Sequence, residues 1–312
     1  MAKPVLLEGD LMGISFRDFD MDESIVAPVI YDTNPHRTTN RGVVLSSEVR
    51  KELRRFLSGF NDSVGIERTP YYRIDAYFNE QFLWILEVNA SFVDGWGTAL
   101  NLARASGIAV DPSALLFPNR FATKNMIYRP ELKLFISELE ALGIGGHGIC
   151  EWKSGDASPV YVYGRVGSKD QPHIAPFDGI RLDNKLNLGL FGRVWDGNSI
   201  KIPRHYIARF ERWESIPKEV VLKFCDKGST ECVRARQSVM FNKPLGKAPF
   251  LKRCYGAETL LAQDIVYPTR QNESNCQLVV LAIGSEPITG YIQYSRSRII
   301  NDDSIHGPLW IS

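Results

Sequence analysis

The sequence has little of several features that would point to a simple class of protein. Its 312 residues carry a formal charge of only +1, which leaves no global field for non-specific binding to nucleic acid or to a membrane surface. The longest apolar stretches, such as residues 278–283, are far shorter than the roughly 20 residues that span a bilayer. An acidic residue stands near the start, before any signal-like apolar core, so we expect no secretory signal.

Cysteine and histidine are also few, and neither occurs in a metal-binding pattern. The five histidines lack the spacing of a zinc site. A Gly-x-Ser-x-Gly elbow, a Walker loop and a dinucleotide fingerprint are absent from the sequence, which argues against the commonest hydrolase and nucleotide-binding patterns. The five cysteines are scattered, so we expect free thiols in a reducing, cytoplasmic compartment: Cys150, Cys225, Cys232, Cys254 and Cys276.

What is present is typical of a soluble globular protein, with 44% hydrophobic and 23% charged residues. Apolar stripes at helical spacing predict helices at about 46–59, 98–106 and 130–143. Aromatic and β-branched runs predict strands at 148–152, 159–166, 220–224, 278–283 and 291–300. Because helices and strands mix without a regular βαβ rhythm, an α+β or mixed α/β fold is favoured, and we expect α+β.

Residues 71–89 carry the most informative pattern in the chain. Two aromatic and β-branched runs flank the polar residues 79–81, which predicts a β-hairpin centred on Gln81. In that register Arg73 faces Asn89, and Asp75 faces Glu87. The other face of the hairpin would then carry only apolar side chains, which fixes the register: Ile74, Ala76, Phe78, Trp84, Leu86 and Val88.

The facing carboxylates have a chemical consequence. At roughly 5 Å apart they repel each other, and the pair is destabilising unless a cation cancels the repulsion. Asp, Glu and an Asn carbonyl are hard oxygen ligands that suit Mg²⁺, which commonly also holds substrate phosphates. Arg73 could bind a phosphate oxygen beside them. The alternative is a solvated hairpin face with an ordinary Arg73–Asp75 pair.

Arg-x-Asp in the first strand and Glu-x-Asn at the end of the second resemble the metal-binding core of the ATP-grasp ligases. That family includes D-alanine–D-alanine ligase and glutathione synthetase. The resemblance implies that Asp75, Glu87 and Asn89 hold two Mg²⁺ ions on the phosphates of ATP. It also implies that Arg73 supports the transferring phosphoryl group.

Other matches to this family lie after the hairpin. The strand at 218–224 resembles the lysine-bearing strand, which implies that Lys223 binds the α-phosphate. On the helix at 182–191, Lys185 would be an earlier phosphate contact, or otherwise a surface helix lysine. A loop and a strand at 231–236 follow. Unless the loop is a plain hairpin turn, its backbone N–H groups near Gly228, Ser229 and Thr230 would cover the β- and γ-phosphates, and Lys227 in the same loop is a further candidate for nucleotide binding.

The segment 259–268 resembles the hinge between the two subdomains of the family. Gln263 stands where many relatives have Glu, and Glu273 is the nearest acidic candidate for the ribose. On a strand, Arg296 and Arg298 would point the same way, toward the γ-phosphate or the acyl substrate, unless they form the charged face of an edge strand. The backbone that would read the adenine edge belongs to Asp264, Ile265 and Val266.

In the usual family order the lysines and the hinge precede the metal ligands, whereas here they follow them. The sequence therefore resembles a circularly permuted ATP-grasp protein, with two α+β subdomains clasping a nucleotide and a small additional α/β subdomain. We expect the metal ligands in 1–107, a small pre-ATP-grasp-like subdomain in 108–182, and the nucleotide-binding subdomain in 183–312. Residues 1–100 hold 10 basic and 15 acidic side chains, and residues 201–312 hold 16 and 11, consistent with cations at one end and phosphates at the other.

The sequence thus predicts an ATP- and Mg²⁺-dependent carboxylate–amine ligase that acts through an acyl phosphate. Its partners would be ATP, a small-molecule or peptide carboxylate and an amine, with no nucleic acid and no membrane. Two alternatives stay open: a small-molecule kinase on the same fold, and a non-catalytic nucleotide-binding or interaction module. The identities of the carboxylate and the amine and the oligomeric state are not readable from the sequence.

Overall fold

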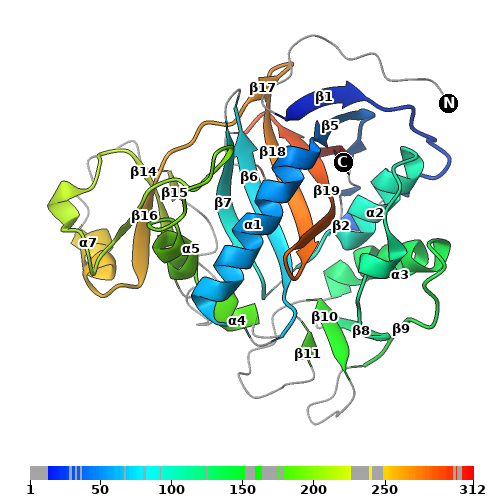
Figure 1. Cartoon of the computed structure of the whole chain (residues 1–312), viewed down its shortest axis with the longest axis horizontal. Helices are drawn as coiled ribbons and strands as arrows, with labels where there is room; N and C mark the ends of the chain where they lie inside the picture. The colour runs from blue at the N-terminus through cyan, green and yellow to red at the C-terminus, as the bar shows by residue number, and fades with distance from the viewer. Residues whose placement is uncertain are drawn as a thin grey trace.

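The structure is a computed structural model, and a large twisted sheet forms its centre (Figure 1). A helix covers one face of this sheet, two helices cover the other, and two smaller sheets lie at opposite sides. The residues that it describes are 13–27, 30–31, 34–35, 37–66, 68–79, 82–91, 93–123, 126–151, 159–163, 174–175, 179–225, 239–240, 249–297, 300 and 304–312.

The central sheet has ten strands and runs in the order β1-β5-β20-β19-β18-β6-β7-β12, with β17 beside β18 and β4 beside β20. Its middle strands pair antiparallel, whereas β20 runs parallel to β5, and β12 runs parallel to β7. The strands are β1 (Ile14–Asp18), β4 (Arg37–Thr38), β5 (Arg41–Leu45), β6 (Tyr71–Phe78), β7 (Leu83–Asn89), β12 (Ile200–Lys201), β17 (Arg270–Gln271), β18 (Ser274–Ile283), β19 (Glu286–Ser295) and β20 (Ile305–Ile311).

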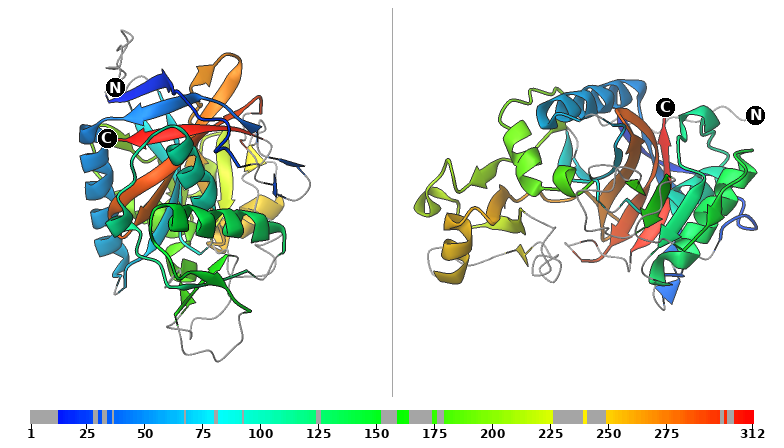
Figure 2. Two further views of the ribbon diagram at one scale, coloured as in Figure 1. Left: turned by 90° about the vertical axis from the view of Figure 1, so that its right-hand side faces the viewer. Right: turned by 90° about the horizontal axis from the view of Figure 1, so that it is seen from below.

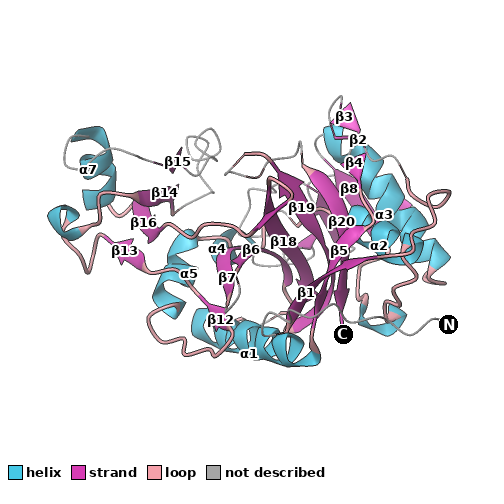
Figure 3. Ribbon diagram, turned by 90° about the horizontal axis from the view of Figure 1, so that it is seen from above, coloured by secondary structure: helices cyan, strands magenta, loops and turns pink. Residues whose placement is uncertain are grey.

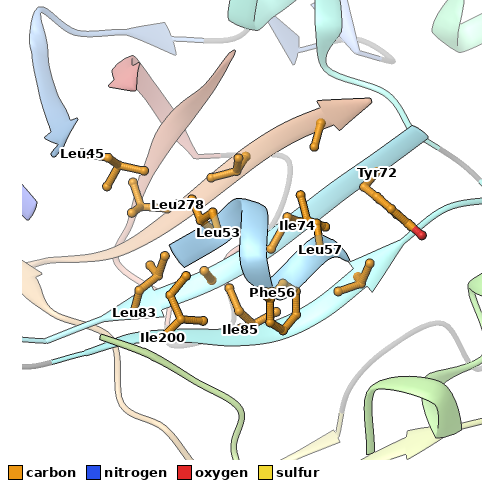
Figure 4. Packing of buried hydrophobic residues seen from close by; sticks show 14 of the residues in the cluster. Leu45, Leu53, Phe56, Leu57, Tyr72, Ile74, Leu83, Ile85, Ile200 and Leu278 are labelled. Atoms are coloured by element: carbon orange, nitrogen blue, oxygen red, sulfur yellow. The ribbon is translucent and has the colours of Figure 1, made fainter. Parts of the chain in front are cut away.

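Helix α1 (Ser47–Val64) packs across one face of the central sheet (Figures 1 and 4). The side chain of Ser46 caps it by accepting a hydrogen bond from the Val49 N–H, and Gly65, with φ of 66°, ends it. The helix continues to Val64 instead of ending near Gly59. Its predicted apolar stripe is confirmed, because all of its members are buried: Val49, Leu53, Phe56, Leu57 and Phe60.

The other face of the sheet is covered by α2 (Trp96–Ala105) and α3 (Arg129–Ala141), which share one core with β18. The helices expected at 98–106 and 130–143 are thus both present, with slightly different ends. Because β18 lies between the two layers, its side chains alternate between them, with Leu278 in the α1 core and Val279 in the α2 core. This explains its unbroken apolar run. Beyond α3 lies a parallel sheet in the order β11-β10-β8-β9. Its strands are β8 (Arg120–Thr123), β9 (Gly148–Ile149), β10 (Val160–Tyr163) and β11 (Ile174–Ala175).

An antiparallel sheet in the order β13-β16-β14-β15 forms a separate lobe beside the β7–β12 edge of the central sheet (Figure 3). Helix α5 (Lys185–Phe191) lies between this lobe and α1, and α7 (Pro249–Gly256) packs on its outer side (Figures 2 and 3). The strands of the lobe are β13 (His205–Ile207), β14 (Val220–Phe224), β15 (Val239–Met240) and β16 (Leu260–Asp264). The remaining short elements are β2 (Ile30–Tyr31), β3 (Asn34–Pro35), α4 (Gly179–Leu182), η1 (Pro112–Ala114), η2 (Met126–Tyr128) and η3 (Trp213–Ser215).

The fold is α+β, as predicted. The strand at 220–224 is confirmed, whereas the strand expected at 291–300 runs from Glu286 to Ser295. The strand expected at 231–236 lies outside the described residues. The division into 1–107, 108–182 and 183–312 stays a prediction, and the strand pairing crosses its last range: β13, β14 and β16 belong to the lobe, but β18, β19 and β20 belong to the central sheet.

The described cysteines are free thiols, namely Cys150, Cys225, Cys254 and Cys276, and Cys232 lies outside the described residues. Among the residues that the structure describes, no helix combines the length and the apolar character needed to cross a membrane.

The packing of α1 predicts a large effect of Leu53→Ala, because Leu53 is fully buried against the central sheet (Figure 4). The substitution should lower the free energy of unfolding by about 2–5 kcal/mol. Urea denaturation followed by circular dichroism measures this loss. Lys51→Ala, at an exposed position of the same helix, should change it by less than about 0.5 kcal/mol, and equal losses in the two variants would contradict the packing.

Candidate functional site

The hairpin of β6 and β7 has the predicted register where it carries polar side chains. Arg73 pairs with Asn89, and Asp75 pairs with Glu87. Across the other edge of β6, Asp75 pairs with Val279 of β18. Because Val279 belongs to the α2 layer, the polar side chains of the hairpin lie on that face of the sheet, opposite α1.

Between these pairs and the turn, the register slips by one residue. Ala76 pairs with Ile85, so Leu86 is an extra, bulged residue in β7. The bulge reverses the alternation of side chains toward the turn. The prediction that Trp84 and Leu86 lie on the buried face is therefore wrong. Leu83 and Ile85 occupy that core instead, together with Val88.

Two of the three predicted metal ligands, Asp75 and Asn89, form one hydrogen-bonded group with Arg73. Arg73 Nε donates to Asp75 Oδ1 at 3.1 Å, and Asn89 Nδ2 donates to Asp75 Oδ2 at 2.9 Å. Arg73 Nη1 also donates to Asp94 Oδ1 at 2.7 Å. Burial alone would lower the pKa of Arg73, but the charges of Asp75, Tyr291 and Asp94 hold it well above the ordinary value. The guanidinium therefore stays positively charged between two carboxylates.

The β-bulge connects the hairpin to the lobe. The carbonyl oxygen of Leu86 accepts hydrogen bonds from Lys223 Nζ at 2.7 Å and from Gln263 Nε2 at 3.2 Å. Lys223 lies on β14 and Gln263 on the neighbouring β16, where Gln263 is paired with Val221. Both side chains are buried. The structure thus places the lysine of the predicted phosphate-binding strand against β7, one residue from Glu87.

Lys185 reaches the same place from α5. Asn184 caps the helix by accepting a hydrogen bond from the Leu186 N–H, and the Lys185 N–H donates to the Cys225 carbonyl at 3.0 Å. The start of α5 is thereby fixed to the end of β14. From this position the Lys185 ammonium forms an ion pair with the Glu87 carboxylate. Lys185 is therefore buried and paired with Glu87, unlike the surface lysine of the alternative interpretation.

Two residues that the sequence patterns did not single out hold this arrangement. Asp183, almost fully buried, accepts hydrogen bonds from the Ala90 N–H at 3.2 Å and from the Ser91 hydroxyl, which ties α5 to the loop after β7. His205 lies 3.1 Å from Gln263 Nε2 through its own Nε2. Since the amide nitrogen donates, His205 Nε2 must be the acceptor. Burial and the charge of Lys223 lower the pKa of His205 to about 3, so the ring is neutral.

The loop from β7 to α2 is fixed by a buried carboxylate on α3. Glu131 Oε1 accepts hydrogen bonds from the Gly97 N–H at 2.6 Å and the Thr98 N–H at 3.2 Å, in place of a side-chain N-cap. Burial raises the pKa of Glu131 to about 7, although these N–H groups and Tyr163 act to lower it. Asp94 follows the hairpin in sequence, and Glu131 lies much later, on α3. Only the folded chain shows that Asp94 contacts Arg73 and that Glu131 holds the start of α2 next to Asp94.

The remaining predicted residues lie partly outside the described part of the chain. Lys227, Gly228, Ser229 and Arg298 belong to the undescribed residues. Arg296 is exposed just after β19 ends at Ser295. The expectation that Arg296 and Arg298 share a strand face stays a prediction.

The predicted hinge does connect the lobe to the central sheet, because β16 ends at Asp264 and β17 begins at Arg270. The Asp264 N–H donates to the Arg204 carbonyl at 2.9 Å, so that amide is already used within the protein. Ile265 and Val266 follow it and are half-buried. Glu273 has φ of 67° in the exposed turn between β17 and β18. The roles expected of these residues toward adenine and ribose stay predictions.

The donor set at the hairpin suits a hard cation. Two carboxylates and an amide oxygen come from adjacent positions of paired strands, on the face away from the α1 core. Within the described part of the chain, no group of three or more His, Cys, Asp and Glu side chains is arranged to hold a metal ion. A cation at the hairpin would accordingly take only a few protein ligands and complete its shell with water or phosphate, as Mg²⁺ does.

Comparisons with known proteins give a weak likeness. No protein-family model matches the sequence, and no curated protein matches it. Among solved structures, this chain is similar to one described as a putative gamma-glutamylcysteine synthetase from Methylobacillus flagellatus KT. The identity is 12% and the TM-score 0.45, over 84% of this chain and 85% of that chain.

The buried Glu131 predicts a pH-dependent difference between the wild type and Glu131→Gln. Because the pKa is raised in the folded state, the folded protein retains this proton longer than the unfolded chain. The wild type therefore loses stability as pH rises from about 4.5 to about 7. The glutamine can accept the same N–H groups without this loss.

The thermal midpoint of Glu131→Gln minus that of the wild type should increase as the pH is raised from 5 to 8. Differential scanning calorimetry measures both midpoints. Glu140→Gln, at an exposed position of the same helix, should show no such trend. A difference between Glu131→Gln and the wild type that does not change with pH would contradict the assignment.

Proposed function

We propose that this protein is an ATP- and Mg²⁺-dependent ligase that joins a carboxylate to an amine. An oxygen of the substrate carboxylate attacks the γ-phosphorus of ATP, and the bond to the β,γ-bridging oxygen breaks, giving an acyl phosphate and ADP. The amine nitrogen then attacks the acyl carbon, phosphate leaves with the electron pair of its C–O bond, and the nitrogen loses a proton. The two steps replace one difficult condensation.

The observation that carries this proposal is the meeting of two separate elements. The hairpin supplies the facing carboxylates of Asp75 and Glu87, and the lobe brings the Lys223 ammonium to within 2.7 Å of the Leu86 carbonyl. Lys185 contacts Glu87 directly. Acidic and basic side chains from distant parts of the sequence thus converge on one short stretch of β7. Such an arrangement suits a ligand that carries both signs of charge, namely a polyphosphate bound together with metal cations.

The charges at the site support the same ligand. Around the hairpin, three acidic side chains lie against three basic ones: Asp75, Glu87 and Asp94 against Arg73, Lys185 and Lys223. Unbalanced charge is costly in a partly buried site. ATP with four negative charges and two Mg²⁺ ions adds no net charge, which favours two ions over one. The cations would be held by Asp75, Glu87 and Asn89 and would neutralise charge on the phosphates.

The chain's own residues then have distinct roles. Lys185 and Lys223 bind phosphate oxygens, and Arg73 stabilises the charge that develops on the transferring phosphoryl group. Ile265 and Val266 are the backbone candidates for the adenine edge. The other candidate contacts are Lys227, Gly228 and Ser229 over the phosphates, Glu273 at the ribose, and Arg296 and Arg298 at the acyl group.

On an ATP-grasp scaffold, the proposed order of metal ligands first and phosphate-binding lysines later would correspond to a circular permutation.

The two alternative functions differ in the products they predict. A kinase on the same scaffold would give a stable phosphorylated product without an amide bond. A non-catalytic module would be stabilised by ATP without consuming it. A thermal-shift assay with ATP and MgCl₂, followed by phosphate release in the presence of panels of amino acids and polyamines, separates these cases from the ligase.

The proposed metal ligands predict loss of ATP consumption in Asp75→Asn and in Glu87→Gln. Each substitution keeps the side-chain shape but removes the charge that a cation needs, so phosphate release should fall by at least about 10²-fold. Glu286→Gln is the matched control, since Glu286 also accepts from arginines, Arg50 and Arg54, but these belong to helix α1 and not to the hairpin. Full phosphate release in both hairpin variants would overturn the proposal.

The position of Lys223 predicts that Lys223→Met weakens binding of Mg·ATP by about tenfold or more, because a charge-assisted contact to phosphate is lost. Isothermal titration calorimetry measures the affinity. Lys201→Met is the control, because Lys201 lies on β12, beside β7, and donates to the Gly197 carbonyl. Equal affinities of Lys223→Met and Lys201→Met would remove Lys223 from the site.

A further inference from the structure

Asp94 has a position at the site that its sequence context does not indicate. It follows β7 in the loop that leads into α2, directly before the N-cap residue Gly95. The residue is only 8% exposed, although it carries a charged side chain in a loop. A carboxylate so buried requires a strong partner, and the Arg73 guanidinium at 2.7 Å is that partner.

The two carboxylates that contact Arg73 bind different edges of its guanidinium. Asp75 accepts from Nε and Asp94 accepts from Nη1. Within the described residues, Nη2 donates no hydrogen bond, and the side chain retains 20% exposure. Arg73 is thus fixed on two sides, and one pair of N–H donors remains available for a ligand.

The loop that carries Asp94 is itself held in place. Gly95 has φ of 87°, and a Cβ at this position would lie 2.7 Å from the Tyr291 hydroxyl oxygen, so a larger residue would displace the loop. On its other side, the first turn of α2 is fixed by Glu131. The Asp94 carboxylate therefore has a defined position that does not depend on Arg73 alone.

The contacts of Asp75 suggest why a second carboxylate is needed. Asp75 is shared among Arg73, Asn89 and the proposed cation, so its hold on Arg73 competes with metal binding. Within the part of the chain that the structure describes, the hydrogen-bond partner of Asp94 is Arg73 alone. We propose that Asp94 is a positioning residue, which keeps the Arg73 guanidinium in place with its Nη2 edge presented to the γ-phosphoryl group of ATP. This inference rests on the proposed function.

The experiment compares binding of two probes in MgCl₂ by isothermal titration calorimetry: AMP-PNP, which has a γ-phosphoryl group, and ADP, which lacks it. Asp94→Asn should weaken AMP-PNP binding about tenfold, because one charge-assisted contact to Arg73 is lost. Its affinity for ADP should stay within about twofold of the wild type, since the lysines are unchanged. Retained ADP binding also shows that the variant is folded.

The matched control is Glu138→Gln, which weakens another buried carboxylate–arginine pair between α3 and α2. Glu138 Oε2 accepts from Arg104 Nε at 2.7 Å, at the opposite end of α2 from Asp94. A loss of stability alone would affect both variants alike, whereas positioning of Arg73 affects only Asp94→Asn. Glu138→Gln should keep the wild-type preference for AMP-PNP over ADP.

A double-mutant cycle tests whether Asp94 acts through Arg73. The affinity of Arg73→Gln for AMP-PNP should not fall further when Asp94→Asn is added, because the residue being positioned is already absent. Additive losses would show that Asp94 acts independently and would overturn the inference. Asp94→Glu covers the case in which Asp94→Asn does not fold, since it keeps the charge, displaces the carboxylate from Arg73 Nη1 and should show the same selective loss.

The two proposals fail in different ways. A wild type that binds neither AMP-PNP nor ADP would overturn the proposed function and the role of Asp94 with it. A wild type that prefers AMP-PNP, together with an unchanged preference in folded Asp94→Asn, would overturn only the role of Asp94.

Discussion

The pairing of Asp75 with Glu87 across the β6–β7 hairpin is the constraint on which the rest of the site depends. Two like charges in register on paired strands are unfavourable, so the fold must bring positive charge to them. It does so with Arg73 from the same strand and Lys185 from α5. The bulge at Leu86 adds a second connection, because it turns a backbone carbonyl toward Lys223. The hairpin thereby determines where the lobe of β13–β16 attaches to the central sheet.

In the absence of a ligand, the protein's own ammonium groups occupy the surroundings of the carboxylates. Lys185 pairs with Glu87, and Lys223 donates to the Leu86 carbonyl. A cation at Glu87 would compete with Lys185, and the displaced ammonium would then be available for a phosphate oxygen. In the proposed function, a nucleotide and its cations would replace these internal ion pairs with new ones between the ligand and the same side chains. The neutral His205 fits this picture, because a positive imidazole beside two lysines would be unfavourable.

Local patterns in the sequence predicted the α1 stripe, the strand at 220–224 and the register at Asp75 and Glu87, since each depends on the spacing of neighbouring residues. The bulge was missed because Trp84, Ile85 and Leu86 are all apolar, so either alternation satisfies the pattern. Asp94 and Glu131 were missed for a different reason. Their partners, Arg73 and the first turn of α2, are distant in sequence or reached through backbone N–H groups, which no side-chain spacing reveals.

The position of a bound cation tests most directly whether the β6–β7 hairpin holds the metal ions of a nucleotide. Crystals grown with Mn²⁺ and AMP-PNP allow the ion to be located by its anomalous scattering. The account predicts a peak between Asp75 and Glu87, with the Asn89 side-chain oxygen beside it and the phosphates between the ion and Lys223. A cation bound elsewhere, or a nucleotide bound away from the β6–β7 hairpin, would contradict it.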